Sequence, residues 1–285
     1  DRLELCADLI VGGTTPSLPL LRQIKAETGL PVRALLRPRF GDFCYDHWEL
    51  AQMEQSAAEL VEAGADGIVT GVLTPEGELD VDALRPIYAA ARRAAEKAGR
   101  PVDCTLHRAF DVCRDPFAAL EAAKALGLAT ILTSGQAASA PEGAELLRQL
   151  VAQAGDSIEI LAGAGVSARN IPALAAQTGA RAFHLSGKQV LESRMTFRRE
   201  GVPTAPTAAR CATSARACPW GCPASRSLRC GRPVSRTSAP RGRRWTPFET
   251  IAKRKRSPTG NPGGRALFYD DELEGKWLSS AGRCR

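Results

Sequence analysis

Long apolar runs are lacking in this 285-residue sequence, and their absence excludes one class of protein. No stretch approaches the ~18–20 consecutive apolar residues that a membrane-spanning helix needs, so an integral membrane protein is excluded. The N-terminus also lacks a basic stretch followed by an apolar segment, so we expect no signal peptide. Apolar residues make up 44% of the chain and charged residues 24%, which is ordinary for a globular protein.

A disulfide framework is also lacking, although the chain has nine cysteines. Nine is an odd number, and the first four cysteines lie far apart along the chain without framework spacing. Widely spaced thiols of this kind are typical of reduced, intracellular proteins. We therefore expect reduced thiols and a cytoplasmic location.

The charge of the chain is unevenly distributed and divides the sequence in two. Residues 1–203 carry 21 lysines and arginines against 26 acidic residues, whereas residues 204–285 carry 17 against 5. The first part gives no electrostatic reason to bind nucleic acid, and only the basic second part does. We predict a domain over residues 1–203 and a separate basic tail over residues 204–285.

The tail has few of the apolar residues that a packed core requires. It contains eight Leu, Ile, Val or Phe residues in 82, about half of the ~20% below which disorder is expected. Such a composition cannot offset the entropy of ordering, so we predict a non-globular tail that is disordered or mistranslated. Within it, Lys253–Arg256 matches a nuclear localisation signal, so a nuclear location is the alternative to a cytoplasmic one.

Residues 1–203 alternate between short apolar runs and amphipathic stretches. The apolar runs predict seven strands: Arg2–Leu9, Val32–Pro38, Gly67–Leu73, Val102–Ala109, Thr130–Thr133, Ile158–Ala162 and Ala180–Leu185. The stretches between them predict six helices: Leu18–Thr28, Asp46–Ala63, Val81–Ala98, Pro116–Leu126, Glu142–Ala154 and Ala168–Gln177. This alternation predicts an α/β fold built from parallel β/α units.

A barrel is favoured over an open doubly wound sheet. The Gly-rich fingerprint that often follows the first strand of such a sheet is missing, and Val11–Thr14 stands in its place. Polar residues instead gather at the carboxyl ends of many strands, which is typical of a (β/α)8 TIM-type barrel. Seven strands are one short of eight, so we predict that the first β/α unit is absent. The two unpaired edges would favour exchange between chains and thus a homo-oligomer.

The first predicted strand carries an acidic residue, a thiol and a second acidic residue on one face. Side chains alternate along a strand, so Glu4, Cys6 and Asp8 share one face while Leu3 and Leu5 share the other. The leucines should contact the helices, which directs the polar set into the barrel. Charge there is costly unless it is paired, so we interpret Glu4 as a ligand or catalytic carboxylate. Cys6 is a metal-ligand candidate or a small buried hydrophobe.

Two arginines follow the second predicted strand. Arg37 and Arg39 share a face directed toward the mouth of the barrel. Inward arginines must meet carboxylates or phosphates, so they are candidates for binding an anionic ligand. The alternative is a structural pairing with Glu4 and Asp8.

The densest polar cluster, His107–Asp111, ends the fourth predicted strand. Histidine has the unperturbed pKa nearest neutrality, so His107 is the acid–base candidate, with Asp111 or Glu4 as its partner. The last three strands end in small or hydroxyl residues that suit an anion: Ser134, Gly163, Gly165 and Ser186.

Six segments, taken in order, resemble the CutC family of copper homeostasis proteins: Glu4–Cys6, Arg37–Phe43, Gly71–Pro75, His107–Asp111, Ile131–Gln136 and Gly163–Val166. The resemblance runs from residue 1 to about residue 200. It implies a TIM-type barrel, a cytoplasmic setting and a role in copper tolerance and trafficking. It also implies copper binding by cysteine thiols near the first two strands of the family, of which the second matches Cys6.

Two functions of different class follow from these residues. The first is a copper homeostasis protein that binds Cu(I), since a thiolate at Cys6 suits this soft ion. The second is a barrel enzyme that acts on a small phosphorylated or carboxylated metabolite by acid–base chemistry at His107. In that enzyme Arg37 and Arg39 would hold the anion. Nucleic-acid binding by the tail is a third, weaker interpretation.

Overall fold

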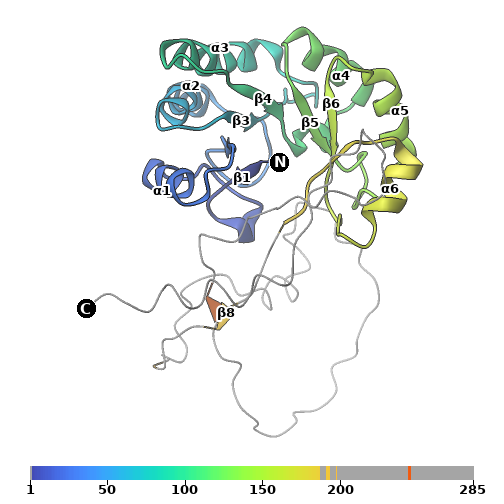
Figure 1. The fold of residues 1–285 in the computed structure, drawn as a ribbon. Coiled ribbons are helices and arrows are strands. Elements are labelled where there is room, and N and C mark those ends of the chain that lie inside the picture. Colours follow the sequence, from blue (N-terminus) through green and yellow to red (C-terminus); the bar gives the residue numbers. More distant parts are fainter. Residues whose placement is uncertain (1, 187–190, 193–196, 198–242, 245–285) are drawn as a thin grey trace, which may run out of the picture. The chain divides into compact units, whose positions relative to one another are not determined.

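A seven-stranded parallel sheet forms the centre of the fold (Figure 1). The computed structural model describes residues 2–186, 191–192, 197 and 243–244. Each strand pairs with the next one in sequence, from first to last: β1 (Leu3–Leu5), β2 (Val32–Leu35), β3 (Gly67–Thr70), β4 (Asp103–Leu106), β5 (Thr130–Thr133), β6 (Glu159–Ala162) and β7 (Ala182–Phe183). This order is that of a TIM-type barrel, which confirms the predicted fold class.

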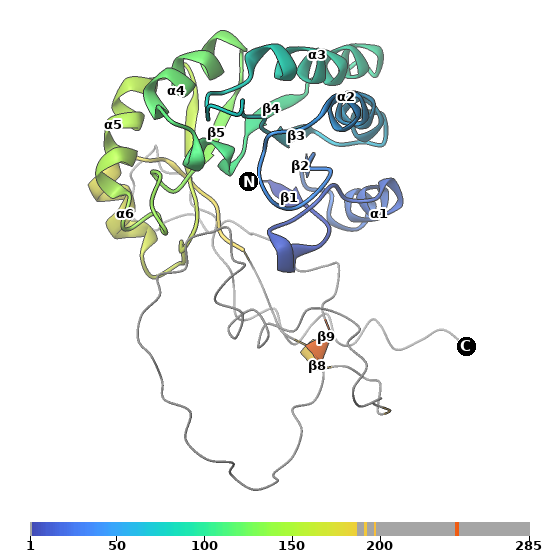
Figure 2. The same ribbon diagram turned by 180° about the vertical axis from the view of Figure 1, so that it is seen from behind.

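The six α-helices of the described residues line the outer side of the curled sheet (Figures 1 and 2). They alternate with the strands: α1 (Leu18–Thr28), α2 (His47–Glu62), α3 (Val81–Lys97), α4 (Pro116–Ala125), α5 (Ala144–Ala154) and α6 (Ile171–Thr178). Asp46 begins α2 with a capping box, in which its side chain and that of Glu49 each accept a backbone N–H of the other. Gly29 ends α1 at φ +61°, a left-handed conformation that glycine adopts at little cost.

Two short 3-10 helices follow strands at the carboxyl end of the sheet. The first is η1 (Leu9–Val11), after β1, and the second is η2 (Arg108–Val112), after β4. A separate unit covers residues 189–247, where β8 (Leu191–Glu192) pairs antiparallel with β9 (Arg243–Arg244). The predicted disorder or mistranslation of residues 204–285 otherwise lies outside the described residues.

Apolar side chains fill both faces of the sheet. The main core lies between the strands and the helices, and its largest fully buried side chains include Tyr88 and Phe110. A second, smaller cluster consists of Leu132, Leu161 and Ala182, which come from β5, β6 and β7. Each fully buried leucine contributes about 1.5–3 kcal/mol relative to an exposed one. Burial on both faces explains why these strands read as continuous apolar runs.

A buried arginine crosses the interior of the sheet from β2. Arg33 Nη2 donates to Asp103 Oδ2 at 2.6 Å, and its Nη1 donates to the hydroxyls of Thr105 and Thr130 at 2.8 and 3.0 Å. Burial lowers the pKa of Arg33, and the Asp103 carboxylate opposes that shift. Arg33 thus ties β2 to β4 and β5. This network was not predicted from the sequence.

The edge strands β1 and β7 are connected by side chains. Within residues 2–186, no backbone ladder joins them, which matches the seven strands expected. His184 Nε2 lies 3.5 Å from Glu4 Oε2, and Arg2 Nη2 donates to Glu159 Oε2 of β6 at 2.8 Å. The Arg2–Glu159 ion pair and the contact of Glu4 with His184 therefore link the β1 segment to the far side of the sheet. Among the residues placed by the structure, no helix is long and apolar enough to cross a membrane.

Candidate functional site

Backbone strain is concentrated at the carboxyl end of the sheet. Three non-glycine residues in the described part of the chain have positive φ: Asp8 at 49°, Gln136 at 54° and Ala164 at 68°. They follow β1, β5 and β6 respectively. Such conformations cost about 1–3 kcal/mol each and cluster at functional sites. The strained residues therefore favour the carboxyl end of the sheet as the location of the functional site, and the polar residues predicted from the sequence lie at the same end.

His107 is a buried hydrogen-bond donor. Its Nδ1 accepts the N–H of Ala109 at 3.2 Å, so the single proton of the neutral ring is on Nε2. That Nε2–H has no hydrogen-bond partner among the residues that the structure describes, and His107 is only 5% exposed. Burial lowers the pKa of His107 to about 3, and the charge of Arg37 lowers it further. At neutral pH, therefore, the ring is uncharged and a poor base.

Arg37 is a buried cation at the end of β2. Its Nη1 donates to Gly13 O at 3.2 Å and its Nη2 to Gly41 O at 3.0 Å, while Nε has no partner in the part of the chain that the structure describes. The guanidinium carbon lies 5.0 Å from the centre of the Phe43 ring. Within the described residues no carboxylate forms an ion pair with Arg37, so the predicted pairing with Glu4 or Asp8 does not occur.

Tyr45 lies beside Arg37 and was missed by the sequence analysis. Its buried hydroxyl faces the Arg37 guanidinium, and its own O–H has no acceptor among the described residues. Burial raises the pKa of Tyr45 to about 12, and the guanidinium groups of Arg37 and Arg39 oppose the shift. Since a phenol is a donor at neutral pH, Tyr45 adds a third unpartnered polar group to this end of the sheet.

Arg39 holds the loop between β2 and α2. Its Nε donates to Glu49 Oε1 at 2.5 Å, and its Nη2 to Asp42 Oδ1 at 3.0 Å and to Cys44 O at 2.9 Å. The hydrogen bond to Glu49 raises the pKa of Arg39. These donors are already used inside the protein, so Arg37 is better placed than Arg39 to bind a ligand.

Asp111 joins the loops that follow β4 and β5. Its carboxylate accepts Arg108 Nε at 2.7 Å, Thr133 Oγ1 at 2.5 Å and the backbone N–H groups of Ser134 and Gln136 at 2.9 and 3.2 Å. Ser134 Oγ in turn donates to Ala137 O at 2.7 Å. The polar atoms of Asp111 and Ser134 are thus engaged in holding the site together.

Local structure explains why glycine stands at the two positions that were predicted to bind an anion, Gly163 and Gly165. A Cβ on Gly163 would lie 2.5 Å from Leu132 Cδ1, so a larger residue would displace the interior cluster. Gly165 has φ +68°, and Asn170 fixes its loop by donating to Gly165 O at 2.8 Å. Ser186 is exposed at the end of residues 2–186. The anion-binding role of these residues stays a prediction.

Cys6 lies half-buried beyond the end of β1. A Cβ on Gly13 would lie 3.2 Å from Cys6 Sγ, so the glycine makes room for the thiol. Glu4, on the same strand, faces His184 instead. Among the residues that the structure describes, no group of three or more His, Cys, Asp or Glu side chains could hold a metal ion. Cys6 is therefore a single soft donor.

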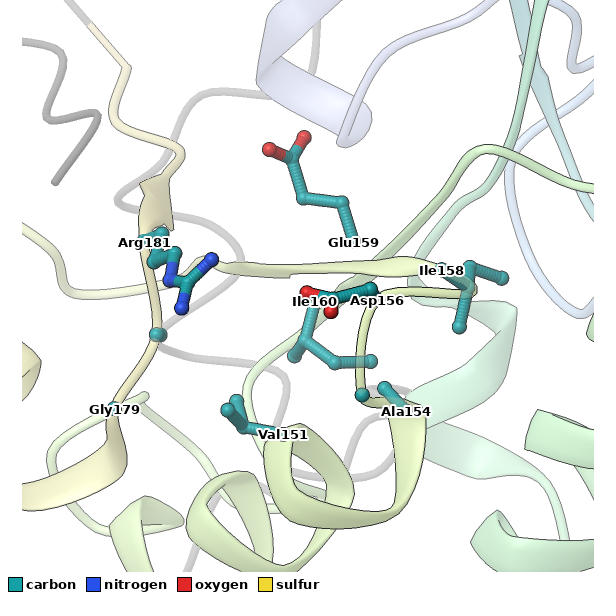
Figure 3. Close-up of a pocket in the computed structure, with 10 residues that line it drawn as sticks. Val151, Ala154, Asp156, Ile158, Glu159, Ile160, Gly179 and Arg181 are labelled. Carbon is teal, nitrogen blue, oxygen red and sulfur yellow. The ribbon is translucent and has the colours of Figure 1, made fainter. Parts of the chain in front are cut away.

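A cavity of about 300 Å³ lies at the amino end of the sheet (Figure 3). Apolar residues such as Val151 and Ile160 line it together with Asp156, Glu159 and Arg181. None of the predicted site residues lines it. In barrels of this type the amino end serves stability and the carboxyl end carries the chemistry, so the candidate site remains at the carboxyl end.

The fold and the site define a barrel-type β/α protein with its polar cluster at the carboxyl ends of the strands. The CutC family profile matches residues 1–189, and the chain belongs to the CutC family. It is 46% identical over 196 residues to a CutC family protein of Vibrio vulnificus (strain YJ016), covering 69% of this chain and 76% of the relative. It is 45% identical over 202 residues to a CutC family protein of Klebsiella pneumoniae (strain 342), covering 71% of this chain and 78% of the relative.

A solved structure shows the same fold. It is a CutC protein of Streptococcus agalactiae, provisionally described as a copper homeostasis protein. The two chains are 32% identical with a TM-score of 0.60, and the match covers 65% of this chain and 87% of that one. The resemblance inferred from the six sequence segments is thereby confirmed at the level of the family.

Proposed function

We propose that this chain is a cytoplasmic copper homeostasis protein that binds Cu(I) as its cargo through the thiolate of Cys6. Membership of the CutC family and the description of the Streptococcus agalactiae relative support a role in copper homeostasis and trafficking. The observation that carries the proposal is the half-buried Cys6 thiol at the carboxyl end of β1. The widely spaced cysteines support a reducing, cytoplasmic setting.

The surroundings of Cys6 predict weak binding. Cu(I) prefers two or three soft ligands, and the carboxylate of Glu4 is a hard donor. Burial raises the pKa of Cys113 to about 11, which opposes the thiolate form that a metal requires. The ring of His107 already uses Nδ1 for Ala109. A single thiolate leaves Cu(I) incompletely coordinated.

Replacing Cys6 should weaken Cu(I) binding at least about tenfold, or about 1.4 kcal/mol. The measurement is a competition titration against a Cu(I) chelator under reducing conditions, with wild type and Cys6→Ser compared. Cys44→Ser is the matched control, because Cys44 is the other half-buried thiol of the described residues. Equal affinities of wild type and Cys6→Ser would remove Cys6 from the site.

The second candidate function is the barrel enzyme that acts on a small phosphorylated or carboxylated metabolite. It is favoured by one observation, the buried charge of Arg37 without an acidic partner in the described part of the chain. Burying an unpaired charge is costly, so an anionic ligand would stabilise this site. In this function His107 acts as a neutral donor that polarises an oxygen, and Asp111 holds the loops.

A further inference from the structure

We propose that Arg37 and His107 bind the carboxylate of a small organic acid, with Arg37 Nε–H and His107 Nε2–H as the donors. The proposal rests on the second candidate function and names its ligand class. It does not depend on copper binding at Cys6.

Charge is the first argument for an anion. Arg37 is 6% exposed, and two of its nitrogens are used by the carbonyl oxygens of Gly13 and Gly41. These carbonyls, the Phe43 ring and the neighbouring Tyr45 hydroxyl are its partners within the described residues, and none of them is an anion. A guanidinium buried in this way retains a full positive charge, and its Nε–H is left without an acceptor. A ligand with one negative charge satisfies both.

The unused donors are the second argument. Buried polar atoms are nearly always hydrogen-bonded, so two unpartnered N–H groups at one place need an explanation. The ring of His107 packs on Phe43 with centroids 4.7 Å apart, and the Arg37 guanidinium lies over the same phenylalanine. Burial raises the pKa of Tyr45 and the neighbouring Arg37 opposes that shift, and the O–H of Tyr45 is a third donor without an acceptor in the described residues. Donors on neighbouring side chains suit a ligand with two acceptor oxygens.

Two glycines maintain the arrangement. A Cβ on Gly71 would lie 2.7 Å from His107 Nδ1, and a Cβ on Gly12 would lie 3.2 Å from Arg37 Nη1. His107 is fixed further by Ala109, which sets the tautomer. Side chains whose positions are fixed before the ligand arrives lose little entropy on binding.

The balance of charge favours a carboxylate over a phosphate. The site offers one positive charge together with uncharged donors, because the ring of His107 stays neutral. A phosphate monoester carries nearly two negative charges at neutral pH, and the second would be buried without a partner. Both donor atoms are shielded from solvent, so binding requires a rearrangement that exposes them.

The test uses the full chain labelled with 15N-histidine. The sequence has three histidines, so His107 is assigned simply by comparison with a His107→Phe variant. Acetate, inorganic phosphate and chloride are added at matched ionic strength. We expect acetate to shift the Nε2–H resonance of His107 and to raise the melting temperature, with phosphate and chloride producing neither effect.

Variants separate the donors from general electrostatics. Arg37→Gln and His107→Phe should each weaken acetate binding at least about tenfold, and His107→Phe keeps the ring that packs on Phe43. Arg114→Gln is the matched control, an exposed arginine that follows η2 at the same end of the sheet, and should bind acetate as wild type does. If Arg37→Gln fails to fold, the acetate affinity of His107→Phe decides whether these donors bind the carboxylate.

The outcomes distinguish the inference from the function on which it rests. A response of His107 to phosphate and not to acetate would overturn the carboxylate assignment and leave an anion-binding function standing. A His107 resonance that responds to neither ligand would overturn both. Unchanged acetate affinity in His107→Phe would also overturn the assignment.

Discussion

Acidification should destabilise the folded protein through His107, by up to about 1.4 kcal/mol for each pH unit. In the unfolded chain this histidine takes up a proton near its ordinary pKa of 6.5, whereas burial lowers the pKa in the folded chain to about 3. Between these values the unfolded state binds more protons, so stability falls as the pH falls. The stabilisation is complete above pH 6.5.

The measurement is urea unfolding of wild type and His107→Phe between pH 7 and about pH 4. Carboxylates titrate in both proteins, so the informative quantity is the difference between their pH dependences. Wild type should lose stability more steeply by up to about 1.4 kcal/mol per unit. Parallel pH profiles would mean that His107 is protonated in the folded state and is no neutral donor.

Asp111→Ala should destabilise the protein by about 3 kcal/mol. The side chain of Asp111 is 6% exposed, and its removal leaves the backbone N–H groups of Ser134 and Gln136 without their acceptor. Each buried donor left unsatisfied costs about 1–3 kcal/mol. The positive φ of Gln136 adds strain that the carboxylate helps to hold.

Asp115→Ala is the matched control for Asp111. Asp115 is exposed and caps α4 by accepting the N–H groups of Phe117 and Ala118, so its loss should cost about 1 kcal/mol. Chemical unfolding of wild type and both variants gives the comparison. Equal losses of stability in the two variants would show that Asp111 does not hold the loops together.

The regular elements were largely predictable from the sequence. The helix Leu18–Thr28 and the strand Thr130–Thr133 have the predicted bounds, because periodicity and flanking signals agree there. Other strands were predicted too long. The run Arg2–Leu9 contains a strand only over Leu3–Leu5, since the residues beyond it leave the ladder and form the loops of the site.

The position of the site was predictable from the sequence, but the hydrogen-bond partners of its side chains were not. Alternation along β2 directs Arg37 inward, and the same alternation includes Arg33, whose position inside a mostly apolar run hid its role. The partner of Arg39 is Glu49, which belongs to the next helix and also caps it. The unpartnered hydroxyl of Tyr45 leaves no signal in the sequence, because burial depends on the packing of distant segments.

X-ray absorption at the copper edge of the Cu(I)-loaded full chain tests directly whether copper binds through Cys6. We expect a sulfur neighbour of copper in wild type and in Cys44→Ser that is lost in Cys6→Ser. A copper ion surrounded by nitrogen and oxygen alone in wild type, or a sulfur neighbour that persists in Cys6→Ser, would contradict Cu(I) binding through Cys6.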